Sequence, residues 1–216
     1  MKTSEYIVYV VDDDDRVREA VGDLLASHGM RAITFASAGE YVGADKLDIP
    51  SCLILDVELP DINGLDLQKQ IASGDHPPIV FLTGHGDIPS SVQAIKHGAI
   101  DFLTKPISER DLLAAINAAI TQDSAARVER IEIALLKRRY AELTPRERQV
   151  LPLIVSGLLN KQAAAELGIS EVMLQIHRRK VMHKMAAESL ADLVRMSQRL
   201  GIPVTHSRRS GGREGD

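Results

Sequence analysis

Five short apolar runs, separated by helix-like patterns, occupy the first half of this 216-residue chain. They cover residues 6–11, 31–35, 52–55, 79–83 and 102–104. Their richness in Val, Ile, Leu and Phe is typical of strands buried on both faces. Because strands that alternate with helices form parallel sheets, the pattern predicts an α/β doubly wound, five-stranded parallel sheet.

The segments between these runs place apolar residues at helical spacing. Helices are therefore expected near 17–25, 65–71, 92–100 and from Ser108 onward, with a weaker pattern at 37–46. Gly29 is well placed to end the first of these helices, because glycine readily adopts the left-handed conformation that follows a helix.

The second half of the chain differs in pattern and in charge. Residues 1–122 carry 9 basic and 19 acidic side chains, a net charge of −10, whereas residues 123–216 carry 17 and 11, a net charge of +6. We interpret this asymmetry as two domains with different partners. The expected organisation is a first domain over 1–122, a charged helical linker over 123–142, a small all-α domain over 143–202 and a disordered polar tail over 203–216.

The composition excludes several classes of protein. Cys52 is the single cysteine, so an intrachain disulfide and a cysteine-based zinc site are excluded. No apolar run approaches the roughly 20 residues of a membrane span, and the opening "MKTSEY" lacks the apolar segment of a signal peptide. We therefore expect a cytoplasmic protein.

Polar side chains stand where the predicted strands end. Asp12 and Asp13 follow the first strand, Asp56 follows the third, Thr83 ends the fourth and Lys105 follows the fifth. Ligands of open parallel sheets bind at this carboxyl edge. Clustered carboxylates suit Mg²⁺, an aspartate can form an acyl phosphate, and a lysine and a threonine can hold phosphoryl oxygens.

On this interpretation, the four consecutive aspartates of the run Asp12–Asp15 have two different roles. Asp12 and Asp13 would face the metal, whereas Asp14 and Asp15 would begin the next helix, where negative charge is favoured, with Asp15 as its N-cap.

The motifs "VVDDDD", "LILDVELPDINGL", "VFLTGHGD" and "DFLTKP" occur in this order, and with them residues 6–120 resemble a receiver domain of two-component response regulators, a flavodoxin-like fold. The resemblance implies that Asp56 is the phosphoacceptor. It implies that Asp12, Asp13, Asp56 and the backbone carbonyl of Glu58 hold Mg²⁺.

The same resemblance assigns the switching residues. Lys105 would pair with the phosphoryl group, and Thr83 would move to bond it. Phe102 matches the aromatic switch position, and Lys105–Pro106 would be a cis peptide. No turnover of a separate substrate is expected, since the phosphoryl chemistry is directed at the chain itself.

A haloacid-dehalogenase-like phosphatase is the alternative on a similar fold. Asp12 would then be the nucleophile and Asp14 the second acid, with Thr83 and Lys105 as helpers. This alternative leaves Asp56 and the proline after Lys105 without roles, and the chain lacks the further acidic pair that it requires.

The basic half contains a predicted helix-turn-helix pattern. Thr144 and Glu147 form a capping box, and Ser170 caps a helix on which Leu174, Val181 and Met185 share a core-facing side. The opposite side of this helix is polar and basic, which suits insertion into the major groove of DNA. On its own, however, such a helix could equally be a solvated face of an unrelated bundle.

The strings "LTPRERQVL", "NKQAAAELGIS" and "IHRRKVMHKM" resemble the LuxR-type DNA-binding domain, and the two-domain arrangement is similar to the FixJ-type regulators. The resemblance places Gln175, Ile176 and Arg179 at bases and Asn160, Lys161, Arg178 and Lys184 at phosphates. Met173 stands where the LuxR-type family usually has Thr or Ser. We therefore expect that a hydrogen bond to a DNA phosphate is lost there or that the helix tilts differently on DNA. The implied partners are a sensor histidine kinase, double-stranded DNA and a second copy of the chain, through the last receiver helices or the linker helix.

Overall fold

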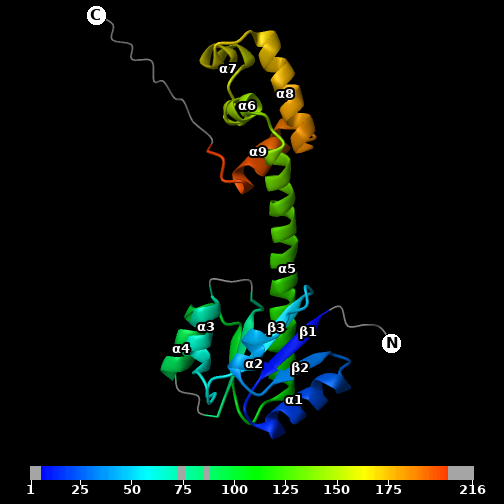
Figure 1. Cartoon of the computed structure of the whole chain (residues 1–216), viewed down its shortest axis with the longest axis vertical. Helices are drawn as coiled ribbons and strands as arrows, with labels where there is room; N and C mark the ends of the chain where they lie inside the picture. The colour runs from blue at the N-terminus through cyan, green and yellow to red at the C-terminus, as the bar shows by residue number, and fades with distance from the viewer. Residues whose placement is uncertain (1–5, 73–75, 85–87, 204–216) are drawn as a thin grey trace, which may run out of the picture. The chain divides into compact units, whose positions relative to one another are not determined.

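The computed structural model describes residues 6–72, 76–84 and 88–203, so most of the tail that we expected to be disordered lies outside the described residues. The chain divides into two compact units, Met1–Val128 and Glu129–Asp216 (Figure 1). No helix among the described residues has both the length and the apolar character needed to cross a membrane.

The first unit is built on a parallel sheet of five strands, which confirms the predicted fold class. The strands run in the order β2-β1-β3-β4-β5. Their bounds are β1 Ile7–Val11, β2 Ala32–Phe35, β3 Ser51–Asp56, β4 Ile79–Thr83 and β5 Asp101–Thr104. Every residue of β1, β3 and β4 is buried, as expected of strands that are covered on both faces.

Helices cover the two faces of this sheet (Figure 1). One face packs against α1 (Asp15–Ser27) and the amino-terminal part of α5 (Glu109–Ala141). The other face packs against α2 (Ala38–Gly43), α3 (Gly64–Ile71) and α4 (Ile88–Lys96). Side chains that follow the parallel strands can meet at the carboxyl edge of the sheet.

Helix α5 is continuous over 33 residues and shows no break near residue 122, where the sequence pattern changes. No Gly or Pro interrupts it, so nothing in the backbone ends the helix there. Asp123 is buried, and its carboxylate accepts hydrogen bonds from the backbone N–H of Ser51 at 2.8 Å and from Arg127 Nε at 2.8 Å. The helix thus remains packed on the first unit beyond residue 122.

In the described part of the second unit, four further helices pack around one apolar core. They are α6 Pro145–Val155, α7 Asn160–Leu167, α8 Glu171–Met185 and α9 Leu190–Arg199. The predicted capping box between Thr144 and Glu147 is confirmed, and so is the Ser170 cap of α8. Gly168 ends α7 with φ 62°, a left-handed backbone conformation that residues other than glycine rarely adopt.

Candidate functional site

Three carboxylates meet at the carboxyl edge of the sheet. Val11 lies opposite Leu55 in the β1–β3 register, so Asp12 and Asp56 follow at the same level. One carboxylate oxygen each of Asp12, Asp13 and Asp56 can be chosen so that all lie within 4.8 Å of one another. Asp12 and Asp56 are buried, whereas Asp13 is exposed, so the cluster is open to solvent on one side.

Lys105 joins the two buried carboxylates. Its Nζ donates to Asp12 Oδ2 at 2.7 Å and to Asp56 Oδ2 at 2.6 Å. It follows β5 and precedes Pro106, and the peptide bond between them is cis, as the resemblance implied. Burial alone would lower the pKa of Lys105, but the hydrogen bonds to both carboxylates outweigh it and raise the pKa.

The buried carboxylate of Asp12 is harder to ionise than a solvated one. Burial raises its pKa, and the hydrogen bonds from Lys105 and from the backbone N–H of Asp14 only partly oppose this effect. The neighbouring charge of Asp56 raises it further. A hard divalent cation would relieve this repulsion, and carboxylate oxygens are the ligands that Mg²⁺ prefers, so the donor set fits Mg²⁺.

Backbone groups hold the carboxylates in place. The N–H of Asp14 donates to Asp12 Oδ1 at 3.0 Å, and the N–H of Glu58 donates to Asp56 Oδ1 at 3.1 Å. Gly64 opens α3 directly against this turn, since a Cβ built on it would lie 2.3 Å from the carbonyl oxygen of Asp56. Only glycine allows such a close approach.

The prediction that Asp15 caps α1 is wrong. Asp14 is the N-cap, with extended backbone angles, and its Oδ1 accepts from the N–H of Arg16 at 2.9 Å. Because the carboxylate of Asp12 already binds the N–H of Asp14, the turn closes one residue earlier than expected.

The remaining residues assigned from the receiver resemblance lie around this cluster. Thr83 is buried at the end of β4, beside Thr104 of β5, and its carbonyl accepts from the N–H of Lys105 at 2.8 Å. Phe102 is half-buried in the core on the α2–α4 face, with its ring centroid 6.0 Å from that of Phe81. Glu58 is exposed, in the turn after Asp56.

The outer face of α8 carries the residues that the sequence assigned to DNA bases. Gln175, Ile176 and Arg179 are exposed, while Leu174, Val181 and Met185 are fully buried on the opposite side, as predicted. Exposed polar and basic side chains can contact phosphates and base edges.

Of the four residues assigned to phosphates, Lys161 is exposed on α7. Arg178 Nη1 donates to Asn160 Oδ1 at 3.0 Å, so these two side chains form one polar unit that joins α8 to α7. Lys184 Nζ instead bonds the buried Glu147 Oε2 at 2.7 Å. That ion pair links α8 to the capping box of α6.

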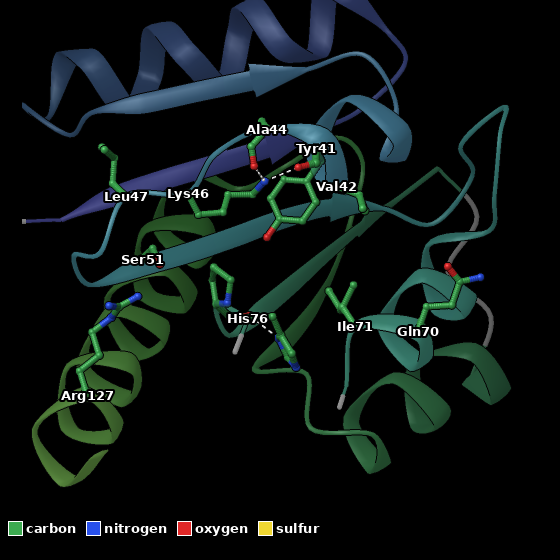
Figure 2. Close-up of a pocket in the computed structure, with 11 residues that line it drawn as sticks. Tyr41, Val42, Ala44, Lys46, Leu47, Ser51, Gln70, Ile71, His76 and Arg127 are labelled. Carbon is green, nitrogen blue, oxygen red and sulfur yellow. Dashed lines mark hydrogen bonds between the residues drawn. The ribbon is translucent and has the colours of Figure 1, made fainter. Parts of the chain in front are cut away.

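A pocket of about 310 Å³ lies at the other end of β3, where Ser51 begins the strand (Figure 2). Lys46 and Arg127 both line it. In Figure 2 the ammonium of Lys46 points to the carbonyls of Tyr41 and Ala44, the second at 2.7 Å. Arg127 pairs with Asp123 and Asp48, so both cations are already bound to neighbouring groups.

The sequence reasoning missed this linkage between α5 and the start of β3. Asp123 looked like one more charge of a solvated helix, and its partner Ser51 lies 72 residues away. The only available indication is that Asp123 follows Leu112, Ile116 and Ala119 on the buried side of the helix at helical spacing.

Comparisons with known proteins agree with both units. Residues 8–117 match the response regulator receiver domain family, and residues 141–197 match the luxR family of bacterial regulatory proteins. Nodulation protein W of Bradyrhizobium diazoefficiens is 46% identical over 95% of this chain and 91% of its own length. The transcriptional regulatory protein FixJ of the same species is 38% identical over 93% of this chain and 98% of its own length.

Solved structures give the same result. The response regulator StyR matches with a TM-score of 0.80 and 43% identity, over 91% of this chain and all of that one. Full-length FixJ from B. japonicum matches with a TM-score of 0.53 and 38% identity, over 94% of this chain and all of that one. The chain therefore belongs to the response regulators in which a receiver domain precedes a LuxR-type DNA-binding domain.

Proposed function

We propose that a sensor histidine kinase phosphorylates Asp56 and that this modification switches DNA binding. The observation that carries the proposal is the ammonium of Lys105, which bridges the carboxylates of Asp12 and Asp56 at the open edge of the sheet. A phosphoryl group on Asp56 would place its oxygens beside this ammonium, which would pair with them by charge-assisted hydrogen bonds.

In the transfer step, a carboxylate oxygen of Asp56 attacks phosphorus, the P–N bond to the kinase histidine breaks, and the leaving imidazole takes up a proton. We propose that Asp12, Asp13, Asp56 and the backbone carbonyl of Glu58 hold Mg²⁺, which offsets the negative charge that gathers there. The ion pair between Lys105 and the buried Asp12 orients the phosphoacceptor before transfer.

The switch then passes from the site to the surface of the receiver. We propose that Thr83 moves to bond the phosphoryl group and that Phe102 repacks beside it. Val92 and Ile95 on α4 are exposed apolar residues, which supports dimerisation through the last receiver helices. The exposed residues Val128, Ile131 and Leu135 of α5 are the alternative contact between two copies.

The DNA contacts follow from α7 and α8. We propose that Gln175, Ile176 and Arg179 face bases, and that Asn160, Lys161 and Arg178 face phosphates. For Lys184 the same role would require its ammonium to leave Glu147. A regulator of transcription acts on chromosomal DNA, so we propose that this protein is cytoplasmic. We also propose that its phosphoryl chemistry modifies only its own Asp56 and turns over no separate substrate.

The phosphatase alternative is less compatible with the site. Asp14, its second acid, caps α1 through the N–H of Arg16, and Asp12, its nucleophile, is completely buried against Lys105. The comparisons provide no support for it either.

Incubation with acetyl phosphate and Mg²⁺, followed by intact mass measurement, tests the proposal. We expect the wild-type chain to gain one phosphoryl group and Asp56→Asn to gain none. Asp56→Asn separates the two hypotheses, because the phosphatase mechanism would label Asp12 and would leave that labelling intact in this variant. Labelling of Asp56→Asn to the wild-type level would overturn the assignment.

A further inference from the structure

The amino-terminal half of α8 presents apolar side chains to solvent. Val172 is 68% exposed, Met173 45% and Ile176 43%. Ile176 follows Val172 by four positions and Met173 by three, spacings at which side chains on a helix are neighbours, so Ile176 joins the other two into one patch. We call Val172, Met173 and Ile176 the α8 apolar patch.

The α8 apolar patch points away from the core of its unit. Leu174 and Val181 are fully buried, and at 100° per residue Val172 and Ile176 lie nearly opposite to them on the helix. Ser170 caps the helix immediately before the patch, by accepting the N–H of Met173 at 3.2 Å. The patch therefore occupies the first two turns, the part of a recognition helix that reaches base edges.

Charge around the patch indicates what covers it. Helix α8 carries four basic residues and one acidic residue, and Arg179 and Lys180 are exposed beside the patch. Lys161 is exposed on α7. An apolar protein partner would not explain this excess of positive charge, whereas a nucleic-acid duplex supplies phosphates for the cations.

The major groove offers one strongly apolar group to a protein, the C5-methyl of thymine. A Val, Met or Ile side chain can contact that methyl, although none of the three can donate or accept a strong base-edge hydrogen bond. Gln175 is exposed next to Ile176, and its amide matches the donor and acceptor pair of adenine. The exposed face of α8 can thus contact thymine methyl groups through the α8 apolar patch and hydrogen-bond adenine through Gln175.

We propose that Val172, Met173 and Ile176 determine sequence specificity by contacting thymine methyl groups, so that this regulator selects A·T pairs under the first two turns of α8. The proposal rests on the DNA-binding function proposed above. It gives Met173 a role in base recognition in place of the phosphate contact that a Thr or Ser would make there.

Replacing thymine by uracil tests this proposal without changing the protein. Preferred duplexes are first selected from a random pool with the full-length chain, beryllofluoride and Mg²⁺. Each thymine is then replaced singly by deoxyuracil, which pairs identically but lacks the methyl. We expect about fourfold weaker binding at each contacted thymine, equivalent to about 0.8 kcal/mol for one buried methyl-sized group.

Variants assign the contacts to side chains. Met173→Ser and Val172→Ser should bind thymine and uracil equally at one position each and keep their discrimination elsewhere. Leu190→Ala, which removes an exposed aliphatic side chain from α9, should keep the wild-type ratio at every position. Both substituted positions on α8 are exposed, so the fold should not change.

The outcomes separate the two proposals. Sequence-selective binding with equal affinity for thymine and uracil at every position would overturn methyl recognition and leave DNA binding intact. No selection from the pool, together with an affinity that does not depend on salt, would overturn the DNA-binding function itself.

Discussion

Replacing Asp123 by alanine should loosen the attachment of α5 to the receiver sheet. The carboxylate is buried and accepts from the N–H of Ser51 at 2.8 Å, so its removal leaves a buried donor unpaired. Such a loss costs about 1–3 kcal/mol. The lost ion pair with Arg127 adds less, roughly 0–1 kcal/mol, because Arg127 is partly exposed and keeps Asp48 as a partner.

The middle values of these two ranges add up to about 2–3 kcal/mol in the free energy of unfolding, or roughly 30- to 150-fold in the population of opened molecules. Cys52 reports this change directly. It is the single cysteine, it follows Ser51 in β3, and it is completely buried. Burial raises the pKa of its thiol, so a thiol reagent reacts only after the strand opens.

The assay is the rate of Cys52 modification by an aromatic disulfide reagent at neutral pH. We expect Asp123→Ala to react 30- to 150-fold faster than wild type. Asp123→Asn keeps an acceptor oxygen for Ser51 and should react roughly fivefold faster, a cost of about 1 kcal/mol. Asn117→Ala, at an exposed position of the same helix, should change the rate little. A wild-type rate for Asp123→Ala would refute the reasoning.

Three further substitutions test the site and the second unit. Gly64→Ala should cost about 1–3 kcal/mol and reduce acetyl-phosphate labelling, because its Cβ would meet the carbonyl oxygen of Asp56; urea unfolding and intact mass measure both effects. Lys105→Met removes the cation between the carboxylates, so Mg²⁺ should raise its melting temperature more than that of wild type; an equal rise would contradict the shared site. For Glu147, burial would raise the pKa, but hydrogen bonds from an α8 lysine and the α6 cap lower it. The ionised Glu147 therefore stabilises the second unit at neutral pH, and this contribution is lost as pH falls through the lowered pKa. In urea unfolding, the free energy of unfolding of Glu147→Gln should consequently depend less on acidic pH than that of wild type.

Local patterns were sufficient to predict the strands and several helix caps. The apolar runs, the capping box at Thr144 and the helix end at Gly29 depend on neighbouring residues, and the structure contains each of them. The cluster of Asp12, Asp56 and Lys105 was also accessible, because parallel strands bring their carboxyl ends to one edge.

Contacts between residues far apart in the sequence could not be predicted from local patterns. The pair of Lys184 and Glu147 joins side chains 37 residues apart, and a charged helix pattern cannot indicate which lysine is held in this way. The N-cap of α1 differs from the expected residue by one position, because the choice depends on a hydrogen bond that only the folded turn forms.

The central claim is that phosphorylation at Asp56 switches the protein between two states. Light scattering of the full-length chain with and without beryllofluoride and Mg²⁺ tests it most directly, because beryllofluoride imitates the phosphoryl group. We predict that the mass of the wild-type chain doubles only when both are present and that Asp56→Asn stays at its original mass. An unchanged wild-type mass, or a doubled mass in Asp56→Asn, would contradict the account.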